Sequence, residues 1–330
     1  MHSIIGLDVG GTKIACVEGT LSAEILQRHE LPTHAEQPFE ATFPAVIELA
    51  RQLLGGAQRA GRRVAALSVA IGGPLRIRDG VLLNPPHLPG WHNVALKARL
   101  EHEFPALPVY IEHDGNAGAL AEFRFGAGRA RRGLRHLVFL TFGTGLGAGF
   151  VLNGKLLRGA CDTAGEVGHW RLAPDGPLGF GKRGSWEGFA SGAGLVELAH
   201  GMFPQRWLRE TPIRALVDAM LADDPEALTV AEEAGRRMGA GLALLIDALN
   251  PQIIVLGSLA VALGDRVLRS AREVVAAEAL PQAVAACDIV PSALGKRIGD
   301  VAALMAALNV ASIARRASRE LEANAEEMRR

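Results

Sequence analysis

The sequence predicts an α/β protein built from two related halves. Residues 3–18 and 136–152 share one pattern, in which an apolar strand leads through a Gly- and Thr-rich turn into a second apolar strand. Such a repeat indicates duplicated supersecondary units. Helical spacing at 38–60 and 195–248, with a further β-branched run at 253–256, favours a mixed α/β fold. A chain of 330 residues is long enough for two domains, each with its own core.

The composition excludes several classes of function. Lys and Arg total 35, as do Asp and Glu, and zero net charge gives no attraction for nucleic acid or an anionic membrane. The 3 cysteines form no CxxC pair, so neither a disulfide framework nor a zinc ribbon is encoded. The N-terminus lacks the features of a signal peptide, and no apolar run is long enough to span a bilayer. We therefore expect a cytoplasmic protein without a nucleic-acid or membrane partner.

The first turn, Asp8-Val9-Gly10-Gly11-Thr12-Lys13, joins two strands and so differs from the strand-to-helix turn of Rossmann and P-loop motifs. Glycine lets backbone N–H groups approach phosphate oxygens, and the Asp8 carboxylate can hold Mg²⁺ through water. A plain hairpin turn is the alternative interpretation of this segment by itself.

The second turn lies at residues 141–149, TFGTGLGAG, and carries four glycines at alternate positions. Each glycine weakens an ordinary strand by up to about 1 kcal/mol relative to Ala. That cost favours the close approach of a ligand over a flexible bend. Two turns of this kind in one chain indicate a nucleotide phosphate site more strongly than either turn does singly.

Polar side chains that suit catalysis lie between and after these turns. Asp114 follows the apolar strand at 109–111, and α/β folds present catalytic groups at such strand ends. Glu166 and His169 are three residues apart within GEVGH, a spacing that lets both face one way on a helical turn. A structural histidine is the alternative, but the flanking glycines and the neighbouring glutamate favour a function.

Together these motifs resemble the ROK family (repressors, open reading frames and kinases) of bacterial sugar kinases. The resemblance runs in order from Asp8 to about Ala307, nearly the whole chain. The ordered set is specific, whereas any single piece is weak. Its members are the phosphate motifs DVGGTK and TFGTGLGAG, the sugar-domain segment HLPGW at 87–91, GEVGH at 165–169, LGS at 256–258, and IGDVAA at 298–303.

The resemblance implies a two-domain actin–hexokinase (ribonuclease H-like) fold with a central cleft. The small α/β domain is expected at residues 1–117, completed by a C-terminal helix at about 300–330. The large α/β domain, with the sugar motifs and the second phosphate loop, is expected at residues 118–299. The implied activity is ATP-dependent phosphorylation of a hydroxyl on a hexose or hexose derivative, by a homodimer.

The resemblance also assigns roles to single residues. Asp114 is the expected general base, because phosphoryl transfer needs alignment, charge neutralisation and one carboxylate that accepts the hydroxyl proton. Asp8 is expected to hold Mg²⁺ through water, and His113 and His87 stand where the family usually has Asn. The sugar is assigned to His87, His113, Asp114, Glu166, His169 and Glu187, and ATP to Asp8, Gly10, Gly11, Thr12, Lys13, Gly143, Thr144, Gly145 and Gly257.

The two histidines in place of Asn leave the sugar and the phosphorylated hydroxyl open. A ROK-type sugar sensor without kinase activity is one alternative, although such regulators carry a helix-turn-helix domain for which Asp8 leaves no room. A kinase for a cyclitol or other non-glucose polyol, and a polyphosphate-dependent kinase, are further alternatives. The arginines that could attract a polyanion are interpreted as a solvated loop; they are Arg129, Arg131, Arg132 and Arg135.

We predict that the folded protein contains no structural zinc, because the family's three thiolate positions hold Leu178, Phe180 and Ser185. Soft sulfur ligands give such sites their affinity, and these side chains offer none. Packing of Leu178, Phe180 and Trp186 is expected to fix the ring of His169 instead. Metal analysis should show zinc well below one equivalent, and chelation followed by Mg²⁺ should leave stability and activity unchanged. Stoichiometric zinc, or melting on chelation, would show that this stretch is aligned wrongly.

Overall fold

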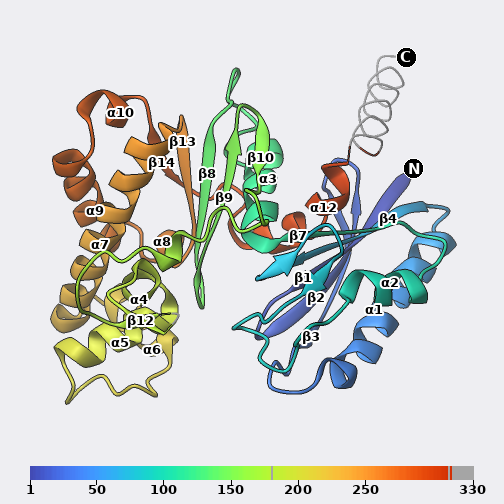
Figure 1. The fold of residues 1–330 in the computed structure, drawn as a ribbon, viewed down its shortest axis with the longest axis horizontal. Helices are drawn as coiled ribbons and strands as arrows, with labels where there is room; N and C mark the ends of the chain where they lie inside the picture. The colour runs from blue at the N-terminus through green and yellow to red at the C-terminus, as the bar shows by residue number, and fades with distance from the viewer. Residues whose placement is uncertain (180, 311–312, 314–330) are drawn as a thin grey trace. The chain divides into compact units, whose positions relative to one another are not determined.

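The computed structural model describes residues 1–179, 181–310 and residue 313. These residues divide into two units, each built on a five-stranded sheet (Figure 1). Unit 1 contains residues 1–125 and 158–164 together with the described residues from Lys296 onward. Unit 2 contains the described residues of 126–157 and 165–295.

The sheet of unit 1 has the strand order β3-β2-β1-β4-β7. The first three strands form an antiparallel meander, whereas β1, β4 and β7 run parallel. Parallel neighbours bring the carboxyl ends of β1, β4 and β7 to one edge. The strands are β1 (His2–Val9), β2 (Lys13–Thr20), β3 (Ile25–Pro32), β4 (Arg63–Ile71) and β7 (Val109–His113), with a small hairpin of β5 (Leu75–Arg76) and β6 (Val81–Leu82).

The sheet of unit 2 repeats this arrangement in the order β10-β9-β8-β13-β14. Again the first three strands are antiparallel and the last three are parallel. The duplication predicted from the two Gly-rich turns is therefore confirmed at the level of topology. The strands are β8 (Leu137–Phe142), β9 (Leu146–Leu152), β10 (Lys155–Leu157), β13 (Ile253–Ser258) and β14 (Asp288–Pro291), with a small hairpin of β11 (Leu178–Gly179) and β12 (Lys182–Arg183).

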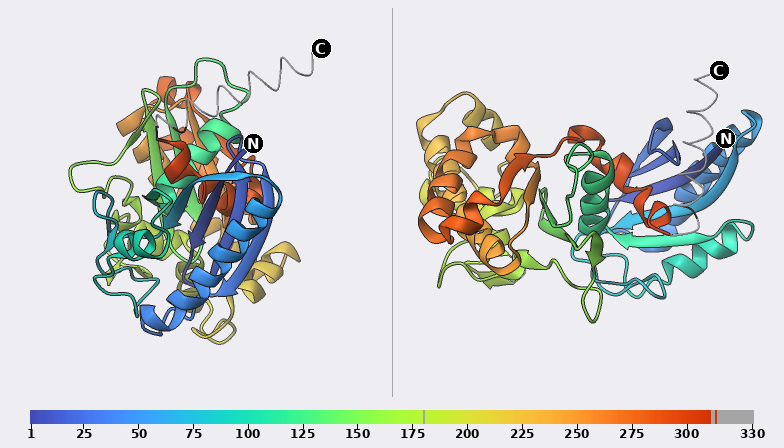
Figure 2. Two further views of the ribbon diagram at one scale, coloured as in Figure 1. Left: turned by 90° about the vertical axis from the view of Figure 1, so that its right-hand side faces the viewer. Right: turned by 90° about the horizontal axis from the view of Figure 1, so that it is seen from above.

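Helices cover both faces of the sheet of unit 1 (Figure 2). Alternate residues of β1, including Ile5 and Leu7, pack into the core beneath α1 and α2. On the other face a Cβ added at Gly6 would lie 3.0 Å from Ala303, so the glycine lets the last helices approach closely. The helices are α1 (Phe39–Arg59), α2 (Leu96–Glu103), α3 (Asp114–Phe125), α11 (Ile298–Ala302) and α12 (Met305–Leu308), preceded by the 3₁₀ turn η2 (Gly295–Arg297).

Unit 2 buries its own core between the sheet and a layer of helices, of which α7 and α9 pack along each other. Asp224 caps α7 by accepting the Ala227 N–H, and Asn250 ends the helix in the left-handed conformation. The helices are η1 (Val167–His169), α4 (Trp186–Ala190), α5 (Gly192–Met202), α6 (Ile213–Leu221), α7 (Pro225–Leu249), α8 (Leu259–Leu263), α9 (Asp265–Glu278) and α10 (Pro281–Ala285).

The expected C-terminal helix at about 300–330 falls mostly outside the described residues. What the structure describes of that segment is α11 and α12, which pack on the sheet of unit 1. Among the residues that the structure describes, no helix has the length and apolar character needed to cross a bilayer.

Close packing between α7 and Trp186 gives a prediction about stability. A Cβ at Gly241 would lie 2.2 Å from the fully buried Trp186 indole, so Gly241→Ala should destabilise the protein by about 1–3 kcal/mol through overpacking. Gly201→Ala in α5 is the control, because a Cβ there meets nothing within 4 Å. That variant should be neutral or gain at most about 1 kcal/mol. Urea unfolding measures both, and equal effects would contradict the packing.

Candidate active site

Two predicted carboxylates lie at the carboxyl edge of the parallel strands of unit 1. Asp8 is the penultimate residue of β1, and Asp114 follows β7 directly as the first residue of α3. In the strand register Asp8 lies beside Ala70 of β4, and Ala70 lies beside Glu112 of β7. The topology therefore brings the first phosphate turn and the predicted general base to one edge of one sheet.

Asp8 is surrounded by negative charge. Burial is the main cause that raises its pKa to about 6, and the carboxylates of Asp114 and Asp300 raise it further. The cations Lys13 and Arg28 oppose the shift. A Cβ at Gly299 would lie 2.4 Å from the Oδ2 of Asp8, so glycine at that position leaves room for the carboxylate. Oxygen donors with excess negative charge suit Mg²⁺, and Asp8 therefore fits the expected metal.

The turn from Gly10 to Lys13 closes on itself, because the Gly10 N–H donates to the Lys13 carbonyl at 3.1 Å. The hydroxyl of Thr33 donates to the Gly10 carbonyl at 2.6 Å and holds the turn against the end of β3. A Cβ at Gly11 would lie 2.7 Å from the carbonyl oxygen of His87. Two sequence-predicted segments, the phosphate turn and HLPGW, therefore pack together.

Lys13 and Thr12 lie at the exposed tip of this turn. The Lys13 ammonium pairs with Glu30 of β3 at 3.2 Å, and Glu30 also accepts from Arg28, which in turn binds Asp300 at 2.9 Å. These contacts form a chain of alternating charges that leads from the phosphate turn to Asp300. The sequence analysis included Asp300 in the motif at 298–303 but assigned it no role, because nothing in the local sequence shows that it lies near Asp8.

Asp114 is accessible, with 48% of its side chain exposed. Its Oδ1 accepts the Gly115 N–H at 2.6 Å and lies 3.3 Å from the Nδ1 of His113. The His113 ring packs against Gly73, where a Cβ would lie 2.9 Å from the ring. The predicted sugar-binding histidine thus contacts the predicted general base.

The remaining predicted sugar residues belong to unit 2. Glu166 precedes the 3₁₀ turn η1 and His169 ends it. Burial raises the pKa of Glu187, and the nearby Glu166 raises it further, whereas the Leu146 N–H, which donates to Glu187 at 2.9 Å, lowers it. That hydrogen bond joins Glu187 to the first residue of β9. Lys182 donates to the His169 carbonyl at 2.5 Å.

The expectation that Leu178 packs to fix the His169 ring is wrong, because 56% of Leu178 is exposed. Leu178 lies on the two-residue strand β11, where its side chain is exposed to solvent and Gly179 is buried. Phe180 lies outside the described residues. Trp186 is fully buried and stacks on Trp170, with ring centroids 5.8 Å apart.

A cavity of about 600 Å³ opens beside the second Gly-rich turn of unit 2. Gly143 and Thr144 contribute to its wall, and at the end of β13 it is Ser258, next to the predicted Gly257, that lines it. Gly143 is held there because its carbonyl accepts the Gly192 N–H of α5 at 2.8 Å. The sequence analysis did not predict the other residues that line the cavity, because they belong to no recognised motif. They include Val196, Glu197, Arg209, Thr211, Ile213 and Leu259.

Comparison with known proteins agrees with this architecture. The ROK family profile matches residues 4–310. A glucokinase of Streptomyces coelicolor is 32% identical over 327 residues, covering 92% of this chain and 96% of that protein. A xylose repressor of Bacillus spizizenii is 27% identical, covering 88% of this chain and 73% of the repressor. The crystal structure of a ROK family glucokinase from Streptomyces griseus, in complex with glucose and AMPPNP, superimposes with a TM-score of 0.74 at 31% identity, covering 93% and 98% of the two chains.

The two repeated sheets and this likeness define a protein of the actin–hexokinase fold. Within that fold, the chain belongs to the ROK family. The family holds both kinases and repressors, so membership alone leaves the activity to be argued from the site.

The crowded charge at Asp8 predicts a stability change that depends on pH. Because the pKa is about 6 in the folded chain and lower in the unfolded chain, the free energy of unfolding should fall as pH rises through about 4 to 6. Without Mg²⁺, Asp8→Asn should therefore be more stable than the parent at pH 7.5 by roughly 1–3 kcal/mol, and equal to it below about pH 4.

Urea unfolding at the two pH values measures this difference. Asp79→Asn is the control, because Asp79 is exposed and pairs with a surface arginine, Arg76, at 3.2 Å; its effect should stay within about 0.5 kcal/mol at both pH values. A destabilised Asp8→Asn protein at pH 7.5 would contradict the electrostatic argument.

Proposed function

We propose that this protein is an ATP-dependent sugar kinase that phosphorylates a hydroxyl of a hexose or hexose derivative. The observation that carries the proposal is the accessible Asp114 carboxylate, placed on the same strand edge as the Asp8 turn. A phosphoryl acceptor needs one carboxylate within reach of its hydroxyl and a separate oxygen ligand for the metal. This edge supplies both.

In this proposal Asp114 accepts the proton of the sugar hydroxyl as the oxygen attacks phosphorus. The Gly115 N–H and His113 hold the Oδ1 of Asp114, which fixes the direction of the carboxylate before substrate arrives. Such preorganisation removes part of the entropic cost of aligning the reactants. Glu166, His169 and Glu187 bind the sugar hydroxyls, with His113 and His87 as further contacts.

Glu187 is suited to a sugar hydroxyl because its pKa is raised by burial and by Glu166. Its Oε2 already accepts the Leu146 N–H, so the carboxyl group keeps a fixed orientation. A buried polar group that must hydrogen-bond a substrate hydroxyl discriminates strongly against analogues that lack it.

ATP binding is assigned to both Gly-rich turns. The backbones of Gly10, Gly11 and Thr12, with Lys13, bind phosphate oxygens, as do Gly143, Thr144 and Gly145. Mg²⁺, held through water by Asp8, neutralises charge on the phosphates when it is bound. The cavity beside Gly143 has largely apolar walls and a size typical of a small-ligand site, and we assign it to the base and ribose next to Gly257.

A sugar-responsive regulator without kinase activity is the second candidate, favoured by the similarity to a xylose repressor. An ADP-release assay with Mg²⁺-ATP over a panel of hexoses, N-acetylhexosamines and cyclitols separates the two. Turnover of any sugar supports the kinase, whereas sugar binding without turnover supports the regulator. Replacing ATP by polyphosphate tests the donor. Two of the four clustered arginines already have partners, since Arg131 pairs with Asp288 and Arg135 with Asn153, and this favours ATP.

The general-base assignment predicts the effect of one substitution. Asp114→Asn should leave sugar binding nearly unchanged and lower kcat by about 10²–10⁴-fold, because the amide cannot accept the hydroxyl proton. Asp218→Asn, in an exposed i,i+4 pair with Arg214, is the matched control and should keep the parent kcat. Steady-state kinetics and calorimetric sugar binding provide the test, and near-parent turnover in Asp114→Asn would reject the assignment.

A further inference from the structure

A second carboxylate lies two residues before Asp114 and has no role in the chemistry described so far. Glu112 belongs to β7, and only 2% of its side chain is exposed. A carboxylate buried to this degree is costly unless it is paired and hydrogen-bonded. Its contacts should therefore show what it does.

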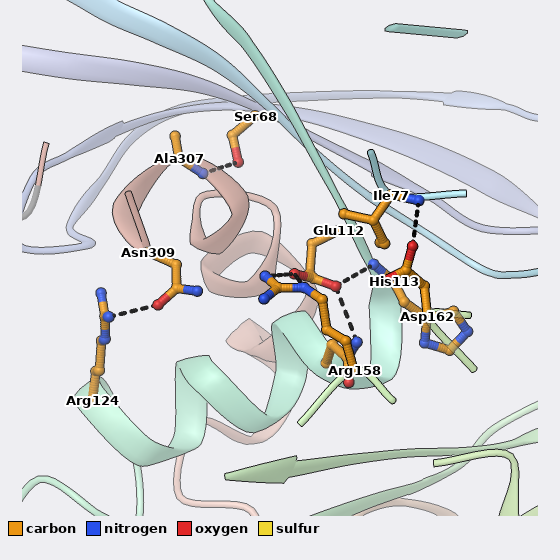
Figure 3. Close-up of polar contacts among 10 residues, drawn as sticks. Ser68, Ile77, Glu112, His113, Arg124, Arg158, Asp162, Ala307 and Asn309 are labelled. Atoms are coloured by element: carbon orange, nitrogen blue, oxygen red, sulfur yellow. Dashed lines mark hydrogen bonds and ion pairs between the residues drawn. The ribbon is translucent and has the colours of Figure 1, made fainter. Parts of the chain in front are cut away.

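Both oxygens of Glu112 are engaged (Figure 3). Oε1 accepts the backbone N–H of His113 at 3.1 Å and the side-chain amide of Asn116 at 3.0 Å. Oε2 accepts from Arg158, at 2.5 Å from Nη2 and 3.1 Å from Nε. The bonds to His113 and Asn116 attach to the chain on either side of Asp114, so one carboxylate ties both ends of the turn that carries the general base.

Arg158 reaches Glu112 from a segment distant in the sequence. Residues 158–164 are flanked on both sides by residues of unit 2, yet they pack with unit 1. Asp162 anchors the same segment a second time, because its Oδ2 accepts the Ile77 N–H at 3.1 Å (Figure 3). The segment also leads directly into Gly165 and the predicted sugar residue Glu166.

We propose that Arg158 is a positioning residue for the phosphoryl transfer, acting through Glu112 on the β7–α3 turn that holds Asp114. The inference rests on the proposed kinase function. Arg158 supplies two donors to one buried oxygen, which fixes the Glu112 carboxylate so that its other oxygen faces the His113 N–H and Asn116. Without Arg158 the carboxylate would be buried with an unpaired oxygen, and it would turn away from those two donors.

The main test is Arg158→Met, measured by steady-state kinetics for sugar and ATP. Loss of the Arg158–Glu112 ion pair should lower kcat by about 10–10²-fold with sugar KM changed less than threefold. A displacement of about 1 Å at the general base is enough for such a loss. In the Asp114→Asn background the same substitution should lower kcat less than twofold, since the base through which Arg158 acts is already absent. Arg158→Lys should restore part of the loss.

A matched control comes from a second buried pair in unit 1. Arg62 donates to Glu18 of β2 at 2.7 and 2.8 Å, and the Glu18 side chain is fully buried. Arg62→Met removes the same kind of contact and should lower the melting temperature while keeping kcat within twofold of the parent. The double variant Glu112→Gln/Arg158→Met should regain most of the lost kcat, because the amide oxygen can still accept from His113 and Asn116 without a buried charge.

Hydrogen exchange provides a readout that needs no activity. The peptide covering residues 109–118 should exchange faster in Arg158→Met than in the parent, and at the parent rate in Arg62→Met. If the parent turns over no sugar in the panel, the kinase proposal fails. The exchange data alone then test whether Arg158 orders the β7–α3 turn through Glu112. Three results overturn the inference: parent-like kcat in Arg158→Met, an equal kcat loss in Arg62→Met, or unchanged exchange at residues 109–118.

Discussion

Electrostatic repulsion among carboxylates at one strand edge is the constraint on which unit 1 depends. Asp8, Asp114 and Asp300 are close enough that the latter two raise the pKa of Asp8. Several features hold them there: Arg28 pairs with Asp300, the absence of a side chain at Gly299 leaves room for Asp8, and the Gly115 N–H orients Asp114. This repulsion lowers stability, and in the proposed kinase it would suit a divalent cation, as expected where function and stability conflict.

Duplication explains how one fold serves two kinds of site. Both sheets have the same strand order and directions, so the β1–β2 and β8–β9 turns are equivalent in topology. Their surroundings differ. The Gly10 turn is fixed by Thr33 and has acidic neighbours, whereas Gly143 is bonded to the first residue of α5 and borders a largely apolar cavity. The same strand–turn–strand unit thus lies in a charged setting in unit 1 and in a largely apolar one in unit 2.

Most of the fold could be predicted from the sequence, because local pattern determines it. Apolar runs ending in Gly-rich turns predicted β1–β2 and β8–β9, and an apolar strand followed by a carboxylate predicted β7 with Asp114. The order of motifs also indicated the ROK family, which the family match confirms. The packing expected of Leu178 failed, because a single apolar residue in a two-residue strand carries no periodicity to show which way it faces.

The sequence by itself determined the chemical groups and their order: the two phosphate turns, the Asp114 carboxylate and the Glu166–His169 pair. Only the tertiary structure decided which groups meet. Asp300 reaches Asp8 because the last helices pack on β1 through Gly6, and Arg158 reaches Glu112 because residues 158–164 pack with unit 1. These interactions join residues 46 and more positions apart. Which charges meet over such separations depends on the folded path of the chain, which no local pattern encodes.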